Sequence, residues 1–215
     1  MTNIYIDIEA INSQDERVKE YFARSVKAPS NYKDPEKIQA YIAEGAIEAV
    51  NKTALDGLGH AICICVAIDE REVATFYAYE PKDEAETLKN LYTYLDDSLG
   101  NNFSPKTFIG HNLVGYDLPM LKKRSMVLGI KPPAYIPFDA KPWDNTVFDT
   151  MIRWDARNFA SLDKLCLAFG LDVKSGMDGS MVNQAYLDGK HDEIASYCNH
   201  DVDVVRELHK RMIYA

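Results

Sequence analysis

The chain has 215 residues, of which 47% are hydrophobic and 27% are charged, and this composition is typical of a folded globular domain. Its net charge of −9 argues against a broad basic surface that binds nucleic acid non-specifically. An enzyme of this charge could still bind the phosphate groups of nucleic acid through a bound metal ion. We expect a cytoplasmic protein with reduced thiols, because no apolar run could span a membrane, the amino terminus resembles no signal peptide and the four cysteines form no C-x-x-C pair.

The first predicted element is a strand over residues 4–9, and it carries two acids. Side chains alternate along a strand, so Asp7 and Glu9 share one face while three isoleucines share the other. Buried like charges repel unless a positive body lies between them, and a hard divalent cation prefers carboxylate oxygen. The alternative is an edge strand whose acids face water, and the strand alone does not decide between the two.

A long polar stretch follows the first strand. Residues 15–55 are helix-prone, a loop over 28–32 interrupts them, and Asp34 before Pro35 is typical of a helix start. We expect residues 11–59 to form a helical insertion, either a cover that selects single strands or docks a partner, or an ornamental layer.

The remaining elements alternate between strands and helices. They predict one mixed sheet flanked by helices in a single domain over residues 1–215. Strands are expected over 60–68, 73–79, 106–110 and 146–148, helices over 84–99, 118–128, 162–169 and 192–212, a short helix after Asp149, and an extended proline-rich loop over 131–145.

Two further acids stand beside predicted apolar surfaces. Asp117 lies at a strand-to-helix turn, where its alternative role is that of a helix N-cap. Asp201 lies next to the apolar stripe of the last helix, one turn after Tyr197, and could instead pair with Arg206. Neither acid is diagnostic alone.

Taken together, three motifs occur in the order found in the DEDD superfamily of 3′–5′ exonucleases. They are Asp7-x-Glu9, Asn112 with Tyr116-Asp117, and Tyr197-x-x-x-Asp201. The chain resembles the tyrosine branch (DEDDy), and is similar to the exonuclease domain of family B DNA polymerases and their stand-alone relatives. The histidine branch places its base five residues before the last aspartate, where Ser196 stands here. His200 directly precedes Asp201 and points elsewhere on the helix, so we expect it to be a bystander without a catalytic role.

The resemblance implies an α/β, ribonuclease H-like fold in which three antiparallel strands precede parallel ones. It implies a metal-dependent 3′–5′ exonuclease that hydrolyses single-stranded DNA from 3′ ends by a two-metal mechanism and releases nucleoside 5′-monophosphates. Its partners would be nucleic acid and possible replication or repair proteins, with no membrane. The implied ligands of two Mg²⁺ or Mn²⁺ ions are Asp7, Glu9, Asp117 and Asp201. Tyr197 would orient the attacking water.

Other assignments stay open at this point. Asn112 is a candidate contact for the terminal nucleotide or a structural loop residue, and core packing is favoured over base stacking for Phe103, Tyr116 and Phe159. Asp149 and Asp163 are expected to cap or support helices. The competing functions are an exoribonuclease of the ribonuclease D type and a non-catalytic module that binds nucleic acid or a partner. The complete set of acids counts against the non-catalytic module.

Overall fold

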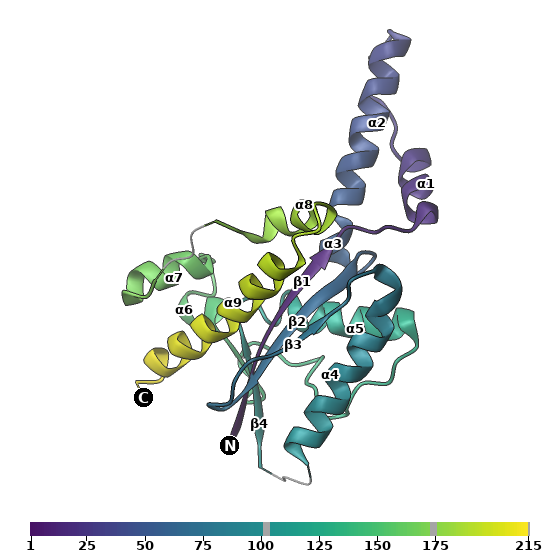
Figure 1. The fold of residues 1–215 in the computed structure, drawn as a ribbon. Coiled ribbons are helices and arrows are strands. Elements are labelled where there is room, and N and C mark those ends of the chain that lie inside the picture. The colour runs from purple at the N-terminus through teal and green to yellow at the C-terminus, as the bar shows by residue number, and fades with distance from the viewer. Residues whose placement is uncertain (101–103, 173–175, 215) are drawn as a thin grey trace.

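A computed structural model describes residues 1–100, 104–172 and 176–214 of the protein. Within these ranges, five strands form one sheet in the order β3-β2-β1-β4-β5 (Figure 1). The strands are β1 (Thr2–Ile11), β2 (His60–Ile68), β3 (Ala74–Tyr77), β4 (Lys106–Gly110) and β5 (Val147–Asp149). The helices are α1 (Glu16–Ser25), α2 (Pro35–Asn51), α3 (Thr53–Asp56), α4 (Glu84–Leu99), α5 (Asp117–Leu128), α6 (Thr150–Trp154), α7 (Leu162–Phe169), α8 (Val182–Leu187) and α9 (His191–Met212).

The strand that carries the first two acids lies at the centre of the sheet. β1 pairs antiparallel with β2 and parallel with β4, while β2 pairs antiparallel with β3 and β4 parallel with β5. The predicted mixed sheet is confirmed. The edge-strand alternative for Asp7 and Glu9 is wrong, because β1 has hydrogen-bonded neighbours on both sides.

Helices cover both faces of this sheet. Ile4, Ile6 and Ile8 of β1 pack with α4 and α5 in one apolar cluster, whereas Tyr5 packs on the opposite face with α8 and α9. The alternation predicted for residues 4–9 therefore places these three isoleucines in one core and turns Asp7 and Glu9 toward the side of α9. None of the helices in the described ranges is long and apolar enough to cross a membrane.

Most predicted elements agree with the structure, and their caps explain where they begin. Asp149 is the N-cap of α6 and accepts hydrogen bonds from the backbone N–H groups of Met151 and Ile152 at 3.1 and 3.4 Å, which confirms its predicted capping role. α7 has the predicted bounds and ends at Gly170, whose φ of 64° suits glycine. The sequence did not predict α8, because six residues are too few for a helical period to stand out.

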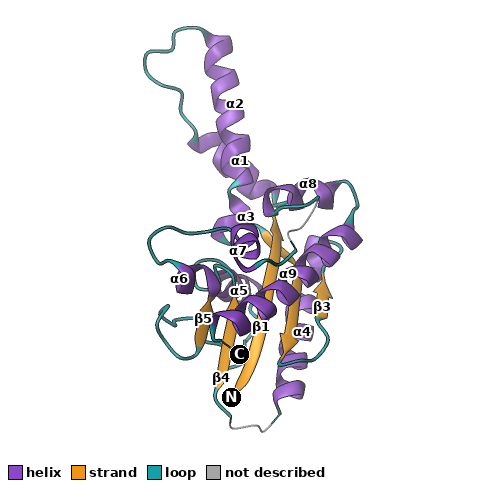
Figure 2. Cartoon of the chain, turned by 90° about the vertical axis from the view of Figure 1, so that its left-hand side faces the viewer, coloured by secondary structure: helices purple, strands orange, loops and turns teal. Residues whose placement is uncertain are grey.

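The insertion forms an arm that projects from the body of the molecule (Figures 1 and 2). Neither α1 nor α2 contains a buried residue. Its base is held firmly, because the backbone N–H of Ser13 donates to Thr53 Oγ1 at 2.7 Å and Asn12 Nδ2 donates to Asn51 Oδ1 at 2.9 Å. A Cβ at Gly59 would lie 2.2 Å from the carbonyl oxygen of Ile11, so only glycine permits this close approach.

A buried ion pair connects the two helices on the isoleucine face. Arg124 of α5 donates two hydrogen bonds, of 2.7 and 2.6 Å, to the carboxylate of Glu84 in α4. Glu84 also accepts from the backbone N–H of Ala61 in β2, and Arg124 donates to the carbonyl of Gly57. Desolvation by burial raises the pKa of Glu84, but hydrogen bonds from His60 and Arg124 outweigh it and hold that pKa below its ordinary value.

Arg124→Met should be strongly destabilising, because it leaves the Glu84 carboxylate buried without its cation. We expect a loss of about 3–5 kcal/mol in the free energy of unfolding, measured by urea denaturation. Glu84→Gln in the same chain should restore part of the loss. Arg17→Met, which removes an exposed cation paired with Asp15, is the control and should barely move the midpoint. Equal effects of the Arg124 and Arg17 variants would contradict this account.

Candidate active site

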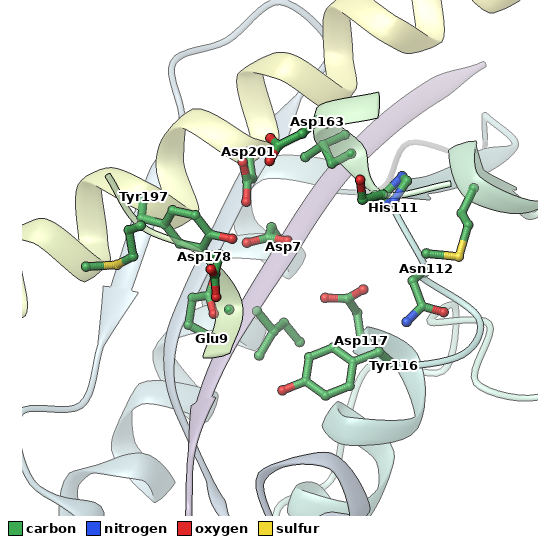
Figure 3. A pocket seen from close by; sticks show the side chains of 16 residues that line it. Asp7, Glu9, His111, Asn112, Tyr116, Asp117, Asp163, Asp178, Tyr197 and Asp201 are labelled. Atoms are coloured by element: carbon green, nitrogen blue, oxygen red, sulfur yellow. The ribbon is translucent and has the colours of Figure 1, made fainter. Parts of the chain in front are cut away.

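A pocket of about 380 Å³ opens between the carboxylate face of β1 and the helices around it. Figure 3 shows side chains of β1, α5 and α9 turned toward its interior. Its lining includes all seven residues that the sequence motifs singled out: Asp7, Glu9, Asn112, Tyr116, Asp117, Tyr197 and Asp201. Residues almost two hundred positions apart in the sequence thus share one pocket.

Three of the carboxylates form a compact group. Asp7, Glu9 and Asp201 each offer an oxygen atom, and these atoms all lie within 4.8 Å of one another. β1 presents the first two from one face, and α9 crosses that face with Asp201 only 8% exposed. A group of this size and chemistry could hold a hard divalent cation.

Asp117 approaches the group from the other side of the pocket. It is the first residue of α5, and Tyr116 occupies the N-cap position, so the capping interpretation of Asp117 is wrong. Its side chain is buried, and Oδ1 accepts no hydrogen bond from the part of the chain that the structure describes. Burial, followed by the charges of Asp7 and Asp149, raises its pKa well above the ordinary range.

The hydroxyl group of Tyr197 points toward the acids (Figure 3). Burial, followed by the negative charges of Glu9, Asp201 and Asp7, raises the pKa of this phenol well above its ordinary value. Tyr197 therefore keeps its proton at neutral pH and can donate a hydrogen bond into the pocket. His200 is not among the residues that line this pocket.

The turn before α5 places Asn112 in the pocket wall. Asn112 has a φ of 61°, a conformation that asparagine tolerates better than most residues. A Cβ at Gly115 would lie 2.3 Å from Asn112 Oδ1, so glycine makes room for the amide. Asp149 accepts hydrogen bonds from the backbone N–H groups of Asn112 and Val114, both at 3.0 Å. Asn112 is thus a structural loop residue whose side chain also faces the pocket.

A cluster of thiols lies beneath the acids. Cys63 and Cys65 of β2 pair with Glu9 and Asp7 across the ladder, and Cys198 of α9 donates a hydrogen bond from Sγ to the carbonyl of Asp7 at 3.4 Å. The three sulfur atoms lie within 4.8 Å of one another. Burial raises the pKa of Cys198, which disfavours the thiolate form that binds metal. Small side chains at this contact let α9 approach the sheet closely.

Sequence reasoning missed two acids of the pocket lining. Asp163 and Asp178 both line it, and Figure 3 shows Asp163 near Asp201. Asp163 is not a helix cap, because Ser161 caps α7. Asp178 caps a short 3-10 turn, Gly179–Met181, and accepts from the backbone N–H of Ser180 at 2.8 Å. In the sequence, each of these two acids stands near the start of a helix that follows a loop. That pattern is too common to identify a residue of the pocket.

The stacking candidates differ in position. Phe159 is 65% exposed, so the core packing expected for it is wrong. Tyr116 is half-buried, packs against the core and lines the pocket. Phe103 lies outside the described residues.

The lining fits a divalent cation better than it fits an organic cofactor. Among the described lining residues there are six acids and no lysine or arginine. The donors are carboxylate oxygens, and Oδ1 of Asp117 is buried and accepts no hydrogen bond from the residues that the structure describes. Hard ions such as Mg²⁺ and Mn²⁺ prefer this donor set.

Comparisons with known proteins agree with this geometry. Residues 58–207, more than half of the chain, match a family model described as a predicted 3′–5′ exonuclease related to the exonuclease domain of PolB. The fold is similar to that of the family B DNA polymerase from the hyperthermophilic archaeon Pyrobaculum calidifontis, with a TM-score of 0.61 and 17% identity over 99% of this chain. The chain spans 24% of that polymerase, and this likeness concerns the fold alone. No curated protein sequence matches the chain. The expected relationship to the PolB exonuclease domain and the ribonuclease H-like fold are confirmed.

The raised pKa of Asp117 gives a pH dependence with a definite sign. The folded state holds this proton more tightly than the unfolded chain, so the associated stability is present at low pH and is lost as pH rises through the folded pKa. In cation-free buffer we expect stability to fall as pH rises above the ordinary aspartate range, and Asp117→Asn to reduce that slope and stabilise the protein at the upper end. Urea midpoints at each pH measure it.

The control for this experiment is Asp139→Asn. Asp139 is exposed, and its hydrogen bond with Lys122 lowers its pKa, so the variant should keep the native slope. An Asp117→Asn protein with the same slope as the native chain would show that burial of this carboxyl is not what limits stability.

Proposed function

The chain belongs to the family of predicted 3′–5′ exonucleases related to the exonuclease domain of PolB, and on that premise we propose that it removes nucleotides from the 3′ end of single-stranded DNA as nucleoside 5′-monophosphates. The observation that carries the proposal is the convergence of Asp7, Glu9, Asp117 and Asp201 in one pocket. A protein that only bound nucleic acid would have no need for this costly arrangement of like charges.

Divalent cations would be held by these four carboxylates. Two bound Mg²⁺ or Mn²⁺ ions would supply Lewis-acid stabilisation of the negative charge that develops on the phosphate and on the leaving 3′ oxygen. Asp7 lies between the carboxylates of Glu9, Asp117 and Asp201 in Figure 3, so it would be the central ligand of the group.

Tyr197 would position the attacking water rather than deprotonate it. Its raised pKa keeps the hydroxyl protonated at neutral pH, so the phenol is a hydrogen-bond donor in the ground state. Because the hydroxyl points toward the acids, a water molecule there could be hydrogen-bonded by Tyr197 and a carboxylate together. An oriented nucleophile needs less reorganisation on the way to the transition state.

The pocket dimensions support a single-stranded end. At about 380 Å³ the pocket is at the small end of ligand sites in proteins, which range over roughly 300–1,000 Å³. It would admit one nucleotide and not a base pair, so a duplex end would have to fray first. The amide of Asn112, held in the wall by the turn, would contact the sugar or base of that nucleotide.

The direct test is digestion of a 5′-labelled oligonucleotide. With Mg²⁺ or Mn²⁺ we expect a ladder of products that shorten from the 3′ end, and chelation of the cation should stop it. Asp7→Ala should abolish the ladder because the variant loses the central ligand. Tyr197→Phe should slow it by about 10²-fold without abolishing it, as expected for loss of a group that positions the nucleophile.

The controls separate this activity from contamination and from the alternatives. Asp139→Ala changes an exposed acid outside the pocket and should leave the rate unchanged. Matched RNA, single-stranded DNA and duplex DNA define the substrate, and faster cleavage of RNA would favour an exoribonuclease. If no ladder forms on any substrate with either cation, the protein is not the proposed enzyme.

A further inference from the structure

The arm formed by residues 15–52 adds nothing to the hydrophobic core. Its two helices contain no buried residue, yet ordering a backbone costs about 1–2 kcal/mol per residue. The arm is ordered by local contacts: Asp15 and Asp34 cap its helices, and Gly45 makes room for Val26, whose Cγ1 would lie 2.8 Å from a Cβ there. It also lies outside the residues that match the exonuclease family. A role in binding would explain an ordered, projecting structure of this kind.

Charge is distributed unevenly between the arm and the body. The chain carries a net charge of −9, but residues 24–37, which run from the end of α1 to the first turn of α2, contain four basic and two acidic residues. Lys27, Lys33 and Lys37 are exposed and form no ion pair with the residues that the structure describes, whereas Lys52 near the base pairs with Glu48 at 2.7 Å. These three lysines are therefore available to an anionic partner.

Two tyrosines accompany the lysines. The rings of Tyr32 and Tyr41 meet edge to face with their centroids 5.7 Å apart, and the residues are 38% and 40% exposed. Tyr32 precedes Lys33 directly, and Tyr41 lies one helical turn after Lys37 on α2. Exposed aromatic rings interleaved with cations are suited to nucleic acid, because bases stack on the rings while the cations neutralise phosphates.

We propose that this arm tip, consisting of Lys27, Tyr32, Lys33, Lys37 and Tyr41, binds the strand whose 3′ end lies in the pocket, at nucleotides upstream of that end. The arm follows β1, the strand that carries Asp7 and Glu9, after the short link over residues 12–15, so both sites belong to one continuous stretch of chain. The 17 residues of α2 measure about 25 Å at 1.5 Å per residue, so the tip lies on the order of 25 Å from the base of the arm. Only a strand that extends well beyond the pocket would reach the arm tip. This inference rests on the proposed exonuclease function.

The test is a binding measurement, which does not depend on cleavage. Fluorescence anisotropy of single-stranded DNA should be followed across a salt series in an Asp7→Ala background. The variant Lys27→Gln, Lys33→Gln, Lys37→Gln should bind an oligonucleotide of about 30 nucleotides at least 10-fold more weakly and reduce the slope of log K against log salt by up to about 2, given about 0.7 per phosphate contact on a single strand. The loss should be larger for this oligonucleotide than for a trinucleotide.

A second triple variant provides the matched control. Lys82→Gln, Lys89→Gln, Lys131→Gln makes the same change in net charge at exposed positions away from the arm, and it should retain the native affinity and slope. If both triple variants bind the long oligonucleotide alike, or if the arm variant weakens the long and short ones equally, the inference is overturned. Binding that depends on the arm without any ladder in the digestion assay would instead refute the exonuclease proposal alone.

Discussion

Electrostatic repulsion within the pocket is the constraint on which the rest of the structure depends. Asp7, Glu9 and Asp201 hold oxygen atoms within 4.8 Å of one another, and Asp117 is buried beside them. Unit charges about 4 Å apart repel by about 4 kcal/mol at a dielectric constant typical of protein surfaces, against a total stability of about 5–15 kcal/mol for a domain. The carboxylates therefore cannot set their own positions, and the surrounding fold must hold them together.

The fold meets this demand with rigid elements rather than loops. β1 is fixed by hydrogen bonds on both sides, and apolar clusters cover both of its faces. Three thiols lie where α9 contacts the sheet, and Cys198 of α9 donates a hydrogen bond to the carbonyl of Asp7, three residues before Asp201. Glu84 and Arg124 fix α5, and with it Asp117, against β2 and α4. Stabilising contacts outside the pocket thus offset a destabilising group inside it.

Local patterns predicted much of this arrangement, and tertiary placement accounts for what they did not. Alternation along residues 4–9 correctly placed Asp7 and Glu9 on one face, and helical periodicity gave the bounds of α4 and α7. The positions of Asp163 and Asp178 depend on how loops return to the pocket, which no short pattern encodes. The apolar positions of α2 were typical of a packed helix, but it packs mainly against the short helix α1, and none of its residues is buried. The cap signal at Asp117 was misleading, because a buried acid at a helix start serves the pocket instead.

The most direct test of the central claim, that these carboxylates form a divalent cation site, is calorimetric titration of the full chain with Mn²⁺. The account predicts saturable binding of two ions per chain. It predicts that Asp7→Ala will abolish this binding and that Asp139→Ala, which alters an exposed acid outside the pocket, will preserve it. No heat of binding to the native chain, or equal binding by the Asp7→Ala variant, would contradict the claim.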